Sequence, residues 1–182
     1  AKTALDAQTK EVDPTEGKTK ATKDAYEKAK AEAIKAVTET EGIITNEDAT
    51  AKEVAEALAN VKAKKADLDR AKEALVDKVT NDQKTSLGQA EAELAVLTED
   101  ELSGSTPASK KAYQDEVAKI ADAIKEAKAK ATEILANPDE KTQTEAALVL
   151  GKVEELKAKL ATAKAGLVDK ADKEELKEAK KA

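Results

Sequence analysis

The chain contains no cysteine, histidine, methionine, tryptophan or phenylalanine, and its only aromatic residues are Tyr26 and Tyr113. Without cysteine no disulfide can form. Without cysteine and histidine, the usual zinc ligands and the usual serine or cysteine catalytic triads are missing. No apolar run approaches the roughly 20 residues that a transmembrane helix requires. The core must therefore be built from leucine, valine, isoleucine and alanine.

These absences argue against an enzyme, and we expect no catalytic, cofactor-binding or metal site. Paired carboxylates occur, as at Glu154 and Glu155, but consecutive residues point to different faces of a helix. No glycine-rich phosphate loop is present. Two acidic stretches, 46–48 (Asn-Glu-Asp) and 99–101 (Glu-Asp-Glu), offer oxygen atoms for a weakly held calcium ion, yet neither has the spacing of a calcium-binding loop. We interpret both as ordinary solvated loops.

The dominant feature that is present is an internal repeat. Residues 50–78 and 142–170 align without a gap, and the segment Leu-Val-Asp-Lys occurs at 75–78 and again at 167–170. A period of about 90 residues in a helical composition is typical of a tandem array of small domains. We therefore predict two repeat units, residues 1–79 and 80–171, followed by residues 172–182 as the truncated first helix of a third unit.

Charge and apolar spacing predict that each unit is a three-helix bundle. Lysine and glutamate interleave along every segment, which is typical of solvated helix surfaces with pairs four residues apart. In the second unit an apolar heptad seam runs from Tyr113 to Ile134 and ends at Asn137-Pro138. Such regular spacing disfavours a disordered chain, the alternative for so polar a composition. Helix starts are predicted at Thr106-Pro107 and at the capping boxes Thr50-x-x-Glu53 and Thr142-x-x-Glu145.

The apolar stripes define the positions that are predicted to face the two cores. Both tyrosines lie on second-helix stripes, which predicts core packing with the hydroxyl near the surface; exposed contact residues are the alternative. Gly42 is predicted to end the second helix of the first unit. The core-facing positions are Leu5, Val12, Tyr26, Ala29, Ala33, Ile34, Val37, Val54, Leu58, Val61, Leu68 and Leu75 in the first unit, and Leu87, Ala90, Leu94, Leu97, Tyr113, Val117, Ile120, Ile124, Ala127, Ala131, Ile134, Val149, Leu150, Val153, Leu156, Leu160 and Leu167 in the second.

The junction between the units contains no glycine or proline from Leu75 to Leu87. The last helix of the first unit is therefore predicted to continue into the first helix of the second. A fresh helix start capped at Asn81-Asp82 is the alternative. The predicted fold class is all-α, with two tandem three-helix bundles in an elongated, end-to-end arrangement.

Three helix-boundary motifs together resemble a known module. They are residues 168–173 (Val-Asp-Lys-Ala-Asp-Lys), residues 106–109 (Thr-Pro-Ala-Ser) and Asn137-Pro138. In this order they resemble the opening, the second-helix start and the following turn of the FIVAR module of Gram-positive cell-wall surface proteins. The first unit departs from the pattern, because residues 19–22 lack the proline and residues 46–48 lack the Asn-Pro turn. The resemblance implies a secreted stalk or adhesin.

Two functions of different classes remain open. The first is a structural spacer or stalk in a bacterial cell-surface protein (adhesin), projecting a distal domain from the cell wall. The second is a binding module that engages a host serum or extracellular-matrix protein through a helix face. The second function requires an exposed apolar patch of a few hundred Å². Outside the predicted stripes, the large hydrophobic residues are Ile43-Ile44 and Leu148, which adjoins Val149 at the edge of a stripe.

Partners and location follow from the same features. No basic patch with interleaved aromatic residues occurs, so we do not expect nucleic-acid binding. Because no apolar run is long enough to span a bilayer, we do not expect membrane insertion. Neighbouring repeats of the same chain are the expected contacts, beside a host matrix or serum protein in the second function, and the chain is expected to be monomeric. It begins with Ala1, so we expect a piece of a longer extracellular protein that is anchored to the cell wall through another region.

Overall fold

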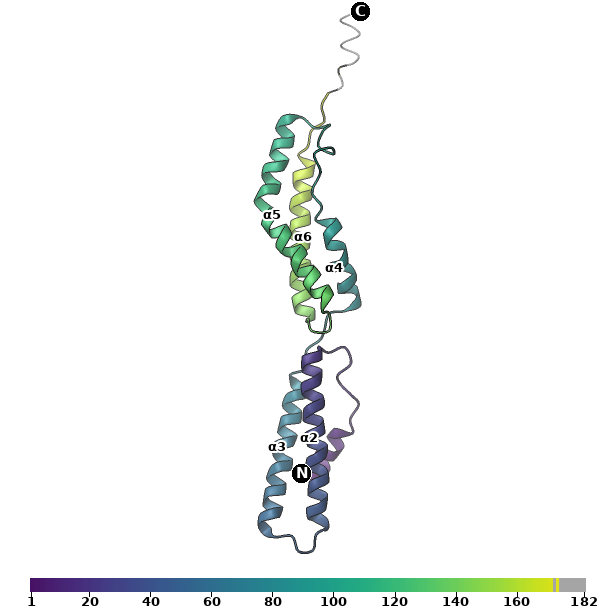
Figure 1. Ribbon diagram of the computed structural model, residues 1–182, viewed down its shortest axis with the longest axis vertical. Coiled ribbons are helices and arrows are strands. Elements are labelled where there is room, and N and C mark those ends of the chain that lie inside the picture. The colour runs from purple at the N-terminus through teal and green to yellow at the C-terminus, as the bar shows by residue number, and fades with distance from the viewer. Residues whose placement is uncertain (172, 174–182) are drawn as a thin grey trace, which may run out of the picture. The chain divides into compact units, whose positions relative to one another are not determined.

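The computed structural model describes residues 1–171 and 173, and this part of the chain is all-helical (Figure 1). Three isolated β-bridges connect residues outside the helices. The all-α fold class is thus confirmed, whereas the predicted third-unit helix at 172–182 lies, residue 173 apart, outside the described residues. The helices are α1 (Lys2–Thr9), α2 (Lys20–Thr45), α3 (Ala51–Glu73), α4 (Asn81–Glu93), α5 (Pro107–Ala136) and α6 (Gln143–Ala165).

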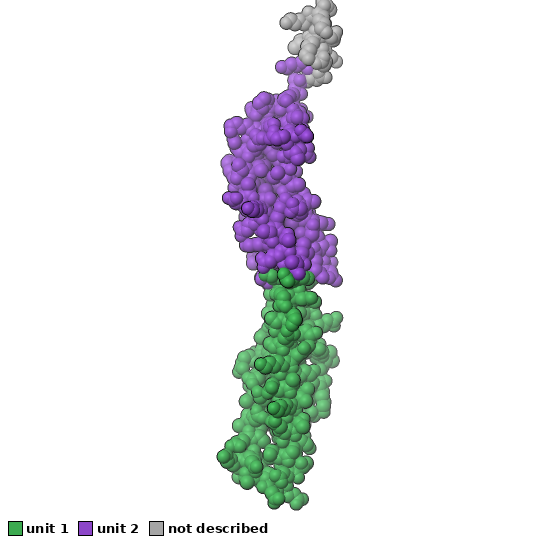
Figure 2. All heavy atoms as spheres, viewed as in Figure 1, with its two compact units in different colours: residues 1–80, 137–143 green, residues 81–136, 144–182 purple. Residues whose placement is uncertain are grey.

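The chain divides into two compact units, which Figure 2 colours separately. Unit 1 comprises residues 1–80 and 137–143, and unit 2 comprises residues 81–136 and the described residues from 144 onward. The sequence placed the boundary after residue 79 and assigned the α5–α6 turn to the second unit. In the structure this turn belongs to unit 1, because its backbone hydrogen-bonds to residues 77–79.

The core of unit 1 lies between α2 and α3, under the short helix α1. α1 ends at Thr9, whose hydroxyl donates to the Asp6 carbonyl at 2.8 Å. Val12 therefore falls in the following loop and is 92% exposed, so its predicted core position is wrong. The buried residues of this core are Leu5, Tyr26, Ala33, Ala36, Val61 and Leu68.

The α2–α3 hairpin is capped as the sequence predicts, but it is longer. The Glu53 amide donates to the Thr50 hydroxyl at 3.2 Å, and the Glu53 carboxylate accepts from the Thr50 amide at 2.7 Å, which confirms the capping box. Gly42 does not end α2, which continues to Thr45, because one glycine inside a helix costs only about 1 kcal/mol. The turn begins at Asn46, where the Ala49 amide donates to the Asn46 carbonyl at 3.2 Å.

Three predicted core positions of unit 1 are half exposed: Ile34 (48%), Val54 (50%) and Leu58 (45%). An ion pair between Lys2 and Glu41 places the start of α1 near the last turns of α2. Because α1 has only 8 residues, it leaves the end of the hairpin without a third helix. Figure 1 shows the N-terminus beside α2, short of the α2–α3 turn.

The predicted continuous helix across the junction is wrong. α3 ends at Glu73 and α4 begins at Asn81, so the alternative of a fresh helix start is correct. Residues 75–80 are not helical, because the backbone groups of residues 76–79 bond to residues 17–19 and 141–143 instead of to each other. Pairing between distant segments has overridden local helix propensity here.

Unit 2 follows its predicted stripes more closely. α5 begins at Pro107, and the Ser109 amide donates to the Thr106 hydroxyl at 3.4 Å, which confirms the N-cap. Leu94 and Leu102 lie beyond the end of α4 yet are fully buried, so the segment that leads to α5 completes the core. The stripe of α6 is centred on Val149 instead of its half-buried neighbour Leu150. The buried apolar residues of the helices are Leu87, Ala90, Tyr113, Ile124, Ala127, Ala131, Ile134, Ala146, Val149, Val153, Leu156 and Leu160.

Candidate functional site

Among the described residues, no three acidic side chains gather in a cluster that could hold a metal ion. In the first acidic stretch, the Asn46 side-chain oxygen accepts the Asp48 amide at 3.0 Å. This bond closes the turn after α2, which makes the stretch a structural element of the hairpin.

The described helices also include none that is long and apolar enough to cross a membrane.

The second acidic stretch is likewise engaged in local bonds. The Glu101 carboxylate accepts the Thr98 amide at 2.7 Å, and the Glu101 amide donates to the Thr98 hydroxyl at 3.3 Å. These bonds to Thr98 lower the pKa of Glu101. Glu99 pairs with Lys110 and accepts a hydrogen bond from the Gln114 side-chain Nε2 at 2.7 Å, and the Lys110 ammonium lowers the pKa of Glu99.

Both tyrosines are buried, which confirms the predicted core packing: Tyr26 is 2% and Tyr113 is 3% exposed. The Tyr113 hydroxyl accepts the Leu97 amide at 2.8 Å and so fixes the segment between α4 and α5. Burial raises the pKa of the Tyr26 hydroxyl.

A backbone pairing that we call strap 1 ties the exit of α3 to the entry of α2. It consists of residues 75–78 and residues 17–22. The Thr19 amide donates to the Val76 carbonyl at 2.8 Å, and the Lys78 amide donates to the Gly17 carbonyl at 2.9 Å. The Val76 amide donates to the Thr22 hydroxyl at 3.3 Å. The strap therefore holds the two helix ends together through main-chain bonds.

Strap 2 repeats this arrangement in unit 2, between residues 167–170 and residues 104–109. The Thr106 amide donates to the Val168 carbonyl at 2.7 Å, and the Lys170 amide donates to the Gly104 carbonyl at 2.8 Å. The Val168 amide donates to the Ser109 hydroxyl at 3.1 Å. Every backbone bond of strap 1 thus has its counterpart, and the identical Leu-Val-Asp-Lys segments supply both straps.

Sequence reasoning missed the straps because it read residues 75–87 as helix. Two signals were available. The segment recurs without a change although its last three residues lie outside the capping boxes and the predicted stripes. Both copies also face a hydroxyl residue three positions after a threonine, at Thr22 and Ser109. In strap 1, Gly17 has φ +71°, a conformation that favours glycine, and it starts the approach to α2.

The strap 1 segment makes a second set of bonds inside unit 1, with the α5–α6 turn. The Val79 amide donates to the Lys141 carbonyl at 3.0 Å, and the Gln143 amide donates to the Asp77 carbonyl at 3.0 Å. The Asp139 carbonyl accepts the amide of Lys20, the first residue of α2, at 2.8 Å. Val79 is only 3% exposed. Residues 77–79 therefore bond on one side to the entry of α2 and on the other to a helix–helix turn.

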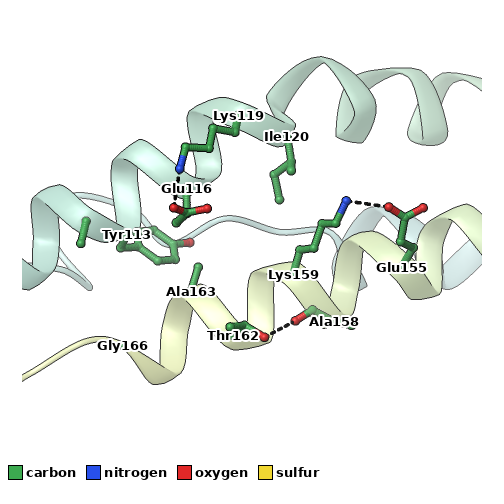
Figure 3. Close-up of a pocket in the computed structure, with 11 residues that line it drawn as sticks. Tyr113, Glu116, Lys119, Ile120, Glu155, Ala158, Lys159, Thr162, Ala163 and Gly166 are labelled. Atoms are coloured by element: carbon green, nitrogen blue, oxygen red, sulfur yellow. Dashed lines mark hydrogen bonds and ion pairs between the residues drawn. The ribbon is translucent and has the colours of Figure 1, made fainter.

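Unit 2 also contains an open groove of about 890 Å³ between α5 and α6 (Figure 3). Tyr113 of α5 points toward Ala163 of α6 across it, and Ile120 and Ala158 also belong to the lining. Ion pairs line the edges: Lys119 pairs with Glu116 at 2.5 Å, and Lys159 pairs with Glu155 at 2.6 Å. Lys152 and Lys159 together lower the pKa of Glu155 to about 2.

Comparisons with known proteins found no family model, no curated protein and no solved structure that matches this chain. The straps and the groove are therefore the features from which a function can be inferred.

Proposed function

We propose that the chain is a structural spacer: stalk repeats of a bacterial cell-surface protein that project a distal domain from the cell wall. The observation that supports this function most directly is the path of the chain through each unit. In each unit the chain enters near one end of the longest helix and leaves near the other end. Each repeat can therefore add length to a stalk, and this needs no ligand. The cell-wall location rests on the FIVAR resemblance of the helix-boundary motifs.

In unit 1 the chain enters and leaves at different ends of α2. The Lys2–Glu41 ion pair sets the entry near the C-terminal end of this helix, and strap 1 fixes the exit at Thr19, next to its N-terminal end. Thr19 and Glu41 are 22 residues apart, which corresponds to about 33 Å at 1.5 Å per helical residue. Because strap 1 holds the exit at Thr19, the distance between chain entry and chain exit is fixed within the unit.

Unit 2 has the same path. Glu91 of α4 pairs with Lys128 at 3.0 Å, and further along the chain the Leu97 amide reaches the Tyr113 hydroxyl. The chain therefore travels toward the N-terminal end of α5, where strap 2 also holds the exit at Val168. Entry and exit again lie toward opposite ends of the longest helix.

Small-angle X-ray scattering tests the spacer function. Two such units in series should give a maximum dimension on the order of 80–100 Å at 1.5 Å per helical residue. Val79→Asp introduces a charge at a buried position next to the α5–α6 turn and should broaden the distribution of dimensions. Val12→Asp makes the same chemical change at a position that is 92% exposed and is the matched control. A compact wild-type particle would contradict the proposal.

The binding-module function has one supporting observation, the apolar groove between α5 and α6. We propose it as the second candidate, with a helix of a host serum or matrix protein as the ligand. Ala158→Trp should fill the groove and abolish binding to immobilised albumin, immunoglobulin or fibronectin. The control Ala118→Trp changes an exposed position of α5 outside the groove lining. Absence of binding by the wild type to all three proteins would contradict this candidate for those ligands.

A further inference from the structure

The end of unit 1 at which α2 turns into α3 has an exposed apolar surface, which we call the tip surface. It consists of Ile44 (63% exposed), Val54 (50%) and Leu58 (45%). Ile44 belongs to the last turn of α2, and Val54 belongs to the first turn of α3. α1 does not extend to this end, because its first residue, Lys2, already pairs with Glu41.

Unit 1 itself shows how a turn of this kind is covered. At the α5–α6 turn, residues 77–79 lie extended and exchange backbone bonds with the turn: Gln143 donates to Asp77, and Val79 donates to Lys141. Val79, which donates one of these bonds, is only 3% exposed. The pairing is antiparallel, with Lys78 opposite Thr142.

The two turns correspond residue by residue at their helix starts. Each begins with an asparagine whose carbonyl accepts an amide three residues on, Ala49 to Asn46 at 3.2 Å and Glu140 to Asn137 at 3.1 Å. Each ends with Thr-x-x-Glu, at Thr50 and at Thr142. The alignment therefore equates Ala51 with Gln143, Val54 with Ala146 and Leu58 with Leu150.

Burial differs sharply between these equivalent positions. Ala146 is completely buried and Leu150 is partly buried, whereas Val54 is 50% exposed and Leu58 is 45% exposed. The larger apolar side chain is thus the more exposed one at the first pair of positions. This is the reverse of what burial of apolar surface favours, and it indicates that the tip surface is built to be covered.

We propose that the tip surface is a docking site for an extended segment of the Leu-Val-Asp-Lys-Val-Thr type, supplied by chain that directly precedes Ala1. The Ala51 amide donates to the carbonyl at the Asp77 position of that segment. The valine at the Val79 position covers Val54. The Lys2–Glu41 ion pair makes the connection short, since six extended residues span about 20 Å.

The proposal takes from the spacer function only the idea that repeats occur in series, and it is tested separately. Lys2 aligns with Lys84, so the added sequence Leu-Val-Asp-Lys-Val-Thr-Asn-Asp before Ala1 occupies the register of residues 75–82. Hydrogen exchange of the Ala51 amide, measured by NMR, is the readout. We expect exchange to slow by at least about tenfold in the extended chain, together with a higher unfolding midpoint for unit 1.

Two matched variants separate docking from a general effect of added residues. The same extension with aspartate at the position that copies Val79 should leave Ala51 exchange as fast as in the unextended chain. Val54→Asp, at an already half-exposed position, should abolish the protection given by the normal extension. Equal exchange rates with and without the normal extension would overturn the proposal. So would protection of the unextended chain that grows with protein concentration, which would assign the surface to a second copy. Neither outcome depends on the scattering dimension that tests the spacer function.

Discussion

Unit 2 fills its core with larger side chains than unit 1 does at the aligned positions. Ile120 and Ile124 of α5 align with Ala33 and Val37 of α2. On the third helices, the completely buried Leu156 aligns with Lys64, which instead pairs with Glu32 at 3.5 Å. In contrast, one side of each strap is the same Leu-Val-Asp-Lys segment in both units.

This difference shows that the helical core and the strap depend on different properties of the sequence. Apolar helix faces tolerate exchange of one aliphatic side chain for another as long as a stripe remains. The strap depends on the positions of backbone donors and acceptors, and on a hydroxyl at Thr22 or Ser109 that receives one amide. A repeat can therefore change its stability through the core while it keeps the geometry of its exit.

The largest effect is expected from truncating the buried leucine that occupies the same repeat position in both cores, Leu68 in unit 1 and Leu160 in unit 2. Leu160→Ala should destabilise unit 2, and Leu68→Ala should destabilise unit 1, each by about 2–5 kcal/mol, because both side chains are at most 2% exposed. Urea unfolding followed by circular dichroism checks this. The control Leu58→Ala, at a position that is 45% exposed, should cost less than about 1 kcal/mol. A loss below about 0.5 kcal/mol at Leu160 would contradict the packing of α6.

Breaking strap 1 should have the next largest effect. Thr19→Pro removes the amide that donates to Val76, and the φ of −63° at this position suits proline. The unpaired Val76 carbonyl should cost about 1–3 kcal/mol in unit 1 and nothing in unit 2.

Thr19→Ala is the matched control for the strap, because it keeps the amide that donates to Val76 and removes only the 2.9 Å bond between the Thr19 and Thr22 hydroxyls. It should be the milder of the two changes. Equal destabilisation by proline and alanine would show that the side chain, and not the strap bond, stabilises this end of unit 1.

The helices were predictable from the sequence because their signals are local. Thr50-x-x-Glu53 and Thr106-Pro107 set helix starts within a single turn, and the heptad seam from Tyr113 to Ile134 sets the buried face of α5. The predicted absence of catalytic, cofactor and metal sites rests on composition and remains a prediction.

The straps were not predictable in the same way, because their bonds join residues about 60 positions apart, such as Thr19 and Val76. No local pattern reports such a pairing, and a stretch without glycine or proline reads as helix. The exposure of Val54 has a similar cause. Its stripe position is correct, but burial depends on how far the 8-residue helix α1 extends.

The two tyrosines offer a smaller test of the difference between the units. Tyr113→Phe leaves the Leu97 amide without its acceptor and should destabilise unit 2 by about 1 kcal/mol. Tyr26→Phe should change the stability of unit 1 by less than about 0.5 kcal/mol, since the described residues show no hydrogen bond to the Tyr26 hydroxyl. Urea unfolding of both variants measures this. Equal losses would mean that the segment after α4 does not depend on Tyr113.

The smallest expected effect is electrostatic and confined to unit 2. Lys152 and Lys159 hydrogen-bond to Glu155 and hold its pKa at about 2, below the ordinary value of 4.5. Because the folded-state pKa is depressed, the contribution of this carboxylate is fully present above about pH 4.5 and is lost as the pH falls toward 2. The aligned residues of unit 1 are Asn60, Ala63 and Asp67, which form no such triad.

Glu155→Gln should therefore flatten the dependence of unit 2 stability on pH between 4.5 and 2, and leave the curve of unit 1 unchanged. The carboxyl titration of Glu155, followed by NMR, should show a midpoint near 2. The side chain lies at the surface, where salt screens the two lysines, so added salt should shift this midpoint back toward 4.5. A midpoint that stays near 4.5 at low salt would show that the lysines do not hold the carboxylate in solution. The charged edge of the groove would then contribute nothing to the difference between the units.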